Sequence, residues 1–556
     1  MRCYGSGPWV ATNWMDGIFM LRYFRLKNLV FSLLCGGIVL GITGGCISDP
    51  AALSKEADEQ VYNIIEKKWR ARFGYQANYR ISDVAASPND IKIKPSDIDP
   101  CEPITLVKAV AIATANNRDY QTQKEELYIV ALDLTSRRHD FERQWFATFD
   151  SSYNRDAANE RITYEPEFGF RQLLAEGTEI SASIALDWIR FLTGDPSMSL
   201  GSVLAATIRQ PLLRGANRDI VLENLTQAER NVLYQIRNFS RFRKSFVVSI
   251  VDDYYRILQL KDRVTNADNN YKRRLQSKER LEMEADAGRR NRFEVDQAAT
   301  DVLRAKDSYV RNQQAYEQAL DQFKIRLSLP TDLDVGLDDK ELSALANMEI
   351  VPPEYVLASA VEAGLIGRLD LATTKDRIDD AQRKINVAAD NLGIKLDIVG
   401  SANVGSGGKS DFTNLQFHNG TYQLGLDVEL PLDQLDDRNT FRKAVISLTR
   451  QKREYDNERA EVKLDIRQAY RQLISAAERY VIQKNSLALA ESRVESTTLL
   501  LEAGRSKTRD LLESQDALLE SQNAVTAALV DHTIAKLNFF RDIGILQVKP
   551  DGMWIQ

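Results

Sequence analysis

The sequence predicts an α+β protein built from two related halves, in which alternating strands lead into a long helical hairpin. All 14 prolines of the 556-residue chain lie outside two long runs, residues 212–329 and 432–549. Each run contains only two glycines, which is helix composition at unusual length. Alternating segments that end at Pro211 and Pro431 precede the two runs, so the same order occurs twice.

The overall composition narrows the class of protein. Lys and Arg number 73 against 79 Asp and Glu, and this weakly acidic balance does not favour nucleic acid as a partner. The hydrophobic content of 44% and charged content of 27% are ordinary for a folded chain. A mean hydropathy of -0.35 with a single long apolar stretch excludes a polytopic helical membrane protein.

The first 45 residues predict an export signal. Arg22, Arg25 and Lys27 precede an uncharged stretch, residues 29–45, which ends in small residues before Cys46. These small residues resemble a bacterial lipobox, in which the cysteine is lipidated and becomes the first residue, although Thr43 stands where a leucine-like residue is usual. An uncleaved membrane anchor and ordinary signal cleavage remain open as alternatives.

The mature chain offers no cluster for catalysis or metal binding. Cys101 is its only other cysteine, so it forms no intrachain disulfide and no CxxC metal site. The three histidines, His139, His418 and His532, have no nucleophile or ligand cluster beside them. We therefore expect no enzyme activity, cofactor or metal. Residues 46–101 read as a linker with breaking prolines and one short helix over residues 57–72.

The glycine of each helical run marks the turn of a hairpin. Ala287-Gly288-Arg289 and Ala503-Gly504-Arg505 occupy the same place in the two runs, and a carboxylate, Glu294 or Asp510, follows six residues after each glycine. We therefore divide the body into a first repeat (102–330), a connector (331–350), a second repeat (351–546) and a tail (547–556). An apolar period of seven predicts coiled-coil packing along arms of roughly 100 Å at about 1.5 Å per residue.

The segments before the runs alternate strictly between apolar and polar residues. They cover residues 145–153, 180–188, 200–209, 395–404 and 422–430. Segments of about 9 to 11 residues with this pattern suit a membrane barrel with a wet lumen. A soluble sheet with one buried face produces the same alternation. The export signal and the long helical arms favour the barrel.

The order of these elements resembles the TolC-like outer-membrane efflux family. The local matches are residues 425–432 (GLDVELPL), residues 501–512 (LEAGRSKTRDLL) and the tail of the last helix, residues 535–546. The resemblance implies a homotrimer in which each chain gives about four strands to a shared transmembrane β-barrel, continued by an α-helical coiled-coil tunnel through the periplasm. The chain departs from this pattern by an extra alternating hairpin over residues 168–188, which either lengthens an external loop or changes the strand count.

The same resemblance implies the function and its partners. The chain would be the passive outer membrane channel of a tripartite efflux or type I secretion system, embedded in outer membrane lipid. It would dock to a periplasmic adaptor protein and an inner-membrane pump. A structural periplasmic coiled-coil lipoprotein without channel activity is the alternative. The exported substrate is not encoded in any motif of the chain.

The resemblance also assigns roles to residues near the two glycines. The hairpin tips that dock the adaptor would be formed by Gly288, Arg289, Glu294, Gly504, Arg505 and Arg509. Asp510 and Glu513 would face the pore as a periplasmic gate of stacked carboxylate rings. Ser506 stands where family members commonly carry a basic residue that ties the tip shut, so closure would rest on Arg505 or Arg509. Charged residues near an exposed turn can also be merely solvated.

Overall fold

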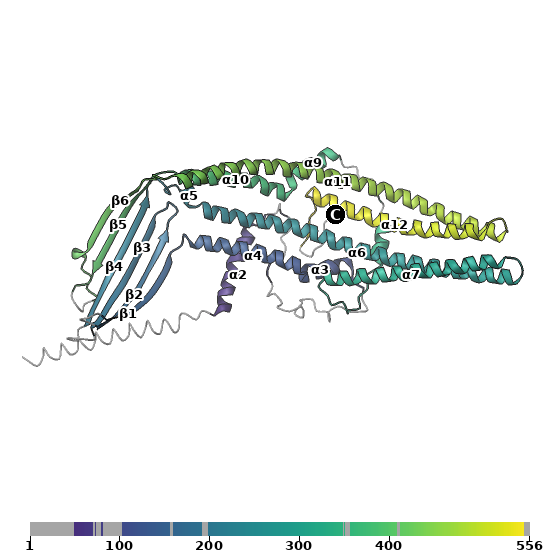
Figure 1. The fold of residues 1–556 in the computed structure, drawn as a ribbon, viewed down its shortest axis with the longest axis horizontal. Coiled ribbons are helices and arrows are strands. Elements are labelled where there is room, and N and C mark those ends of the chain that lie inside the picture. The colour runs from purple at the N-terminus through teal and green to yellow at the C-terminus, as the bar shows by residue number, and fades with distance from the viewer. Residues whose placement is uncertain are drawn as a thin grey trace, which may run out of the picture. The chain divides into compact units, whose positions relative to one another are not determined.

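The computed structural model describes residues 49–70, 73, 79–81, 103–155, 160–191, 198–347, 350, 356–407 and 412–549 (Figure 1). Contacts divide the chain into two units, Met1–Ile64 and Ile65–Gln556, and each is described here by itself. The predicted signal peptide and Cys46 lie outside the described residues, as do most of the linker after residue 70 and residues 550–556.

The helix predicted in the linker, α2, spans Pro50–Lys68 and begins earlier than residue 57. The carboxylate of Asp49 accepts a hydrogen bond from the amide of Ala51 at 3.1 Å. Proline is favoured in the first turn of a helix because its missing N–H would have no partner there. The Asp-Pro pair is therefore the start signal that the sequence-based boundary overlooked.

Six strands form one antiparallel sheet in the order of the sequence. They are β1 (Gln144–Arg155), β2 (Glu160–Leu173), β3 (Glu179–Phe191), β4 (Met198–Pro211), β5 (Lys395–Gly405) and β6 (Thr421–Glu429). The prediction of about four strands per chain is wrong for the described residues. The extra hairpin over residues 168–188 belongs to β2 and β3, which pair with each other except at Glu165 and Pro166. β2 also pairs with β1, and β3 with β4.

The register of the sheet separates its side chains into two faces, because directly opposed residues share a face. The apolar face contains Trp145, Phe149, Tyr164, Phe168, Ile184, Trp188, Leu204, Ile208, Ile398, Ala402, Leu424 and Leu426. The polar face contains Asp150, Thr163, Glu167, Ser181, Ser183, Asp187, Thr207, Arg209, Asp397, Ser401, Gln423 and Asp427. The alternation predicted for the five segments is therefore confirmed in its main pattern, with Phe146, Val203 and Val399 as apolar residues on the polar face.

The remaining elements are helices, and two pairs of them form the predicted hairpins. The helices of the unit that begins at Ile65 are α3 (Leu106–Asn116), α4 (Arg118–His139), α5 (Arg218–Val221), α6 (Glu223–Asp286), α7 (Arg292–Arg326), α8 (Lys340–Ala346), α9 (Leu357–Gly367), α10 (Leu369–Asp390), α11 (Leu435–Glu502) and α12 (Thr508–Asp542). The long arms α6 and α11 contain 64 and 68 residues. Within this unit the sheet lies at one end and the turns of both hairpins lie at the other (Figure 1).

The apolar stripe predicted on the second arm forms a packed core. Val462, Ile466 and Leu473 of α11 are at most 1% exposed and cluster with residues of α9, α10 and α12. The close approach of α9 depends on Gly364, because a Cβ atom there would lie 2.2 Å from Cδ1 of Ile466. The seven-residue apolar period thus describes the contacts of α11 correctly.

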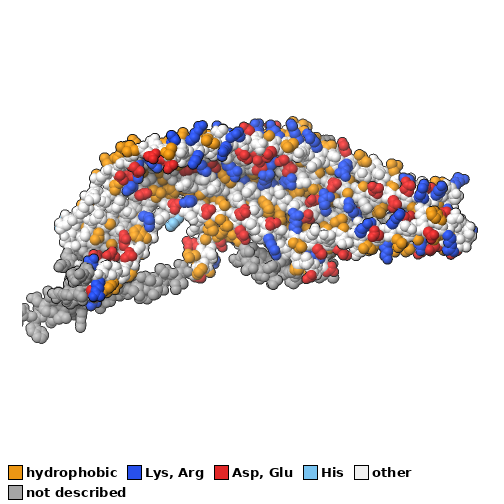
Figure 2. Space-filling view, in the orientation of Figure 1, with side chains coloured by type: hydrophobic (Ala, Val, Ile, Leu, Met, Phe, Trp, Pro, Cys, Tyr) orange, Lys and Arg blue, Asp and Glu red, His pale blue; other side chains and the backbone are white. Residues whose placement is uncertain are grey.

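The described helices carry polar surfaces. None of them combines the length and the apolar character that crossing a membrane requires. Figure 2 shows acidic and basic side chains mixed along the helices, whereas charged side chains are sparse over the sheet in this view. The helical part and the sheet are therefore suited to different surroundings.

Candidate functional site

The two hairpin turns have the same backbone geometry. Gly288 and Gly504 both have a φ of 70°. The amide of Arg289 donates to the carbonyl of Glu284 at 2.9 Å, and the amide of Arg505 donates to that of Leu500 at 2.8 Å. Glycine adopts positive φ without steric cost, so it can close a helix in this way. Both glycines are confirmed as turn residues.

Ion pairs hold the first turn between α6 and α7. Nε of Arg290 lies 3.2 Å from Oε2 of Glu284, and its Nη1 lies 3.5 Å from Oε2 of Glu294. Arg292 pairs with Asp286 at 3.0 Å. The predicted docking residue Arg289 is exposed and takes part in none of the described ion pairs.

Asp510 caps the first turn of α12. Its Oδ2 accepts hydrogen bonds from the amide of Lys507 at 3.0 Å and from the hydroxyl of Ser506 at 3.1 Å. These bonds stabilise the ionised form and lower the pKa of the Asp510 carboxyl. Glu513 is more exposed, and its nearest basic group is Nη2 of Arg493 on α11 at 3.9 Å. Within one chain, Asp510 therefore has a structural role that Glu513 lacks.

Polar contacts join the two hairpins close to their turns. The hydroxyl of Thr508 donates to Oε2 of Glu294 at 2.7 Å, across 214 residues of sequence. Arg280 pairs with Glu502 at 3.0 Å, and Arg290 donates to the carbonyl of Leu501 at 3.4 Å. Arg274 donates to the carbonyl of Leu512 at 3.2 Å and pairs with Asp516. These contacts hold α6 and α7 against α11 and α12.

The arginines in these contacts were not predicted. Among the described ion pairs between the hairpins, the basic partners are Arg256, Arg274 and Arg280 rather than Arg505 or Arg509, which are exposed. Arg274 is 4% exposed and follows Ala267 and Asn270 on the buried stripe of α6. A charged residue at a core position of a heptad pattern is a signal of a specific partner, and it could have identified Arg274.

Comparison with known proteins identifies the second half of the chain. Residues 361–541 match the sequence model of a family described as outer membrane efflux protein. This part of the chain therefore resembles the outer membrane efflux proteins. The match confirms the predicted family and supports the predicted outer membrane location. A search of curated protein sequences gave no match.

Solved structures show that the efflux-protein fold extends beyond residues 361–541. The Campylobacter jejuni CmeC outer membrane channel is similar with a TM-score of 0.58 and 14% identity, over 85% of this chain and 91% of that one. The open Neisseria gonorrhoeae MtrE outer membrane channel gives 0.58 and 15%, over 81% and 90%. The Vibrio cholerae outer membrane protein VceC gives 0.56 and 14%, over 79% and 96%. At these identities the likeness shows the fold.

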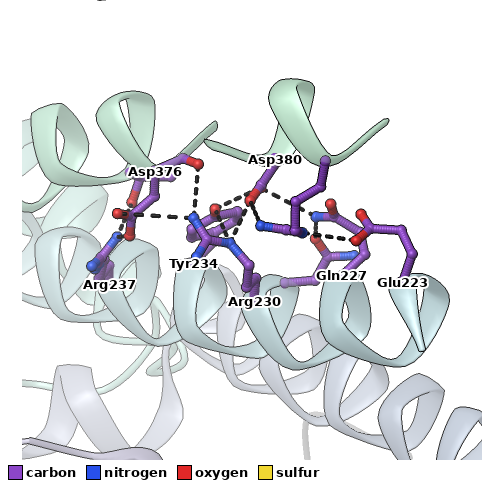
Figure 3. Close-up of polar contacts among 10 residues, drawn as sticks. Glu223, Gln227, Arg230, Tyr234, Arg237, Asp376 and Asp380 are labelled. Carbon is purple, nitrogen blue, oxygen red and sulfur yellow. Dashed lines mark hydrogen bonds and ion pairs between the residues drawn. The ribbon is translucent and has the colours of Figure 1, made fainter. Parts of the chain in front are cut away.

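A second polar cluster joins α6 to α10, away from the turns (Figure 3). Tyr234 donates its hydroxyl hydrogen to Oδ2 of Asp380 at 2.6 Å, and Nη1 of Arg383 lies 3.1 Å from Oδ1 of Asp380. Arg230 pairs with the same carboxylate, and Arg237 pairs with Asp376 at 2.7 Å. Burial and the bond to Asp380 raise the pKa of the Tyr234 hydroxyl. This cluster connects the two halves of the chain.

The described residues contain no group of three or more His, Cys, Asp or Glu side chains placed to hold a metal ion. His532 is 9% exposed on α12. Its burial, with the nearby charge of Lys536, lowers the pKa of the imidazole. The described candidate site thus consists of the two turns and the contacts between helices.

Proposed function

We propose that the chain is a passive duct of the outer membrane that forms a homotrimer and serves a tripartite efflux or type I secretion system. One observation carries this proposal: a sheet with one apolar face and two open edges continues directly into long helical hairpins. The sheet would line the membrane part of the duct, and the hairpins would form the tunnel in the periplasm. The chain would move no cargo against a gradient by itself, so a pump partner would supply the energy.

The open edges of the sheet support assembly with further copies. β1 and β6 each have one neighbour in the sheet, and Leu424 and Leu426 of β6 are 83% and 69% exposed. Unpaired backbone groups cannot stay in lipid, because no water is available to bond them. β6 of one copy would therefore pair with β1 of the next. An even number of antiparallel strands lets all copies pair in the same orientation.

The turns support docking of a periplasmic adaptor at the far end of the helices. Arg289, Arg505 and Arg509 are exposed there and make none of the described contacts between the hairpins, so they are available to a partner. The shared geometry of Gly288 and Gly504 supports the division into repeats 102–330 and 351–546. Lipidation at Cys46 stays a prediction, and it would add an anchor to one that a barrel already supplies.

Planar bilayer recording tests the duct directly. The purified full-length protein, reconstituted without partners, is expected to run as a detergent-stable trimer and to give discrete single-channel conductance steps. Heat-dissociated monomer at the same concentration is the control and is expected to give none. A stable complex that never conducts would instead support the alternative, a structural coiled-coil lipoprotein.

A substitution at Glu513 tests the gate, because it changes the charge there without disturbing the cap of α12. Glu513→Gln is expected to lower cation selectivity several-fold and to weaken block by multivalent cations, because rings of like charge in a narrow throat attract cations. Asp510→Ala is expected to do the same, but it also removes the acceptor for Lys507 and Ser506. That capping is present above the usual aspartate pKa and is lost as pH falls through the lowered pKa of Asp510.

Glu317→Gln is the matched control for the gate, since it makes the same charge change on the exposed surface of α7 far from the turns. Its ion selectivity and block should equal those of the parent. If Glu513→Gln also leaves both quantities unchanged, Glu513 does not face the pore.

A further inference from the structure

β2 and β3 are full members of the sheet rather than an appended hairpin. They contain 14 and 13 residues, against 12 in β1 and 14 in β4. The ladder between β1 and β2 runs without a break from Gln144 and Arg171 to Arg155 and Glu160. The ladder between β3 and β4 is equally continuous. Both strands therefore have hydrogen-bonded neighbours on both sides, and the ladder between β2 and β3 is interrupted only at Glu165 and Pro166.

The apolar face of the sheet continues across these two strands. Trp145 of β1 stacks on Phe168 of β2 at a centroid distance of 5.5 Å, and Tyr164 of β2 packs on Trp188 of β3 at 4.9 Å. Phe168 is 53% exposed and Ile184 is 39% exposed in the single chain. A hairpin that projected into water would leave these large apolar side chains on a wet surface. A wall strand would place them against lipid.

The turn between β2 and β3 is built into the junction of sheet and helices. The amide of Leu174 donates to the carbonyl of Thr178 at 2.8 Å, and Glu176 pairs with Arg218 of α5 at 3.4 Å. Gly177 has a φ of 79°, and a Cβ atom there would lie 2.5 Å from the carbonyl oxygen of Gly215. The hairpin thus begins at the same level as the neighbouring strands and is held there by packing.

We propose that β2 and β3 are wall strands of the barrel, so that three copies close an eighteen-stranded barrel instead of a twelve-stranded one. This inference rests on the proposed trimeric duct. Barrel diameter grows nearly linearly with strand number, so the mouth would be about 1.5 times as wide. Two added strands preserve the antiparallel closure between β6 and β1. A barrel opening of this width would admit extended polymers as well as small solutes. Selection by size would then take place at the end of the tunnel formed by the hairpin turns.

A pair of adjacent substitutions in β3 tests whether this strand faces lipid. Ile184→Arg places a charge on the apolar face at the middle of the strand, whereas Ser183→Arg places the same charge on the polar face. If β3 is a wall strand, Ile184→Arg should reduce the yield of membrane-inserted trimer at least several-fold. Ser183→Arg should leave the yield close to that of the parent. Equal yields from both variants would overturn the proposal.

Electron cryomicroscopy of the unmodified protein in lipid nanodiscs supplies a second measurement that does not depend on a variant. Eighteen strands around a three-fold axis support the proposal. A conducting trimer with twelve wall strands, or a conducting dimer of twelve, overturns it but leaves the duct in place. Failure of the chain to form any channel or barrel would overturn the proposed function itself, together with this inference.

Discussion

Replacing Asp380 by alanine is expected to destabilise the protein, by less than the roughly 3–5 kcal/mol that breaking a fully buried ion pair costs, because its partners Arg230 and Arg383 are 24% and 26% exposed. The Asp380 side chain is only 7% exposed and is shared by Arg230 and Arg383. It also accepts the hydroxyl hydrogen of Tyr234 at 2.6 Å. The substitution would remove all three interactions at once and loosen the contact between α6 and α10 (Figure 3).

A substitution at the neighbouring Asp379 is the matched control, because it removes the same charge from the exposed side of α10. Asp379→Ala is expected to change the free energy of unfolding by less than about 0.5 kcal/mol. Denaturant unfolding of both variants, followed by the far-ultraviolet circular dichroism of the helices, measures the difference. If the two midpoints coincide, the cluster between α6 and α10 does not stabilise the fold.

Gly504→Val is expected to disrupt the second turn and, with it, the association with an adaptor. A side chain at a φ of 70° costs about 1–2 kcal/mol, and a β-branched residue tolerates this conformation least. No atom lies within 4 Å of a Cβ atom placed on Gly504, so the effect would come from the backbone rather than from a clash. The turn would rearrange and displace Arg505 and Lys507.

Gly504→Asn separates the backbone effect from the loss of glycine itself, because asparagine adopts positive φ more readily than other residues. It should retain adaptor co-purification and channel conductance, whereas Gly504→Val should lose co-purification while the isolated trimer still conducts. Full adaptor binding by Gly504→Val would remove the second turn from the docking surface.

The long hairpins were predictable because their signals are local. Freedom from proline, an apolar period of seven and one glycine per turn act within a few residues, and α11 follows them from Val462 to Tyr480. The alternation of the strands is local in the same way. The number of strands in the sheet was not predictable, since the same alternating pattern suits an external hairpin and a strand of the main sheet. Only the hydrogen bonds between β2, β3 and their neighbours place both in the six-stranded sheet.

Local residue patterns predicted where the helices turn, which faces of the strands are apolar and which family the second half resembles. The contacts of Glu294 with Thr508 and of Arg274 with Asp516 are seen only in the folded chain. The same holds for the capping of α12 by Asp510, for which the family resemblance implied only a gate. The spacing of apolar residues predicts which side of an element is buried, because that pattern lies within the element itself. A polar contact between two hairpins depends on how both are placed, and no pattern within either one contains that information.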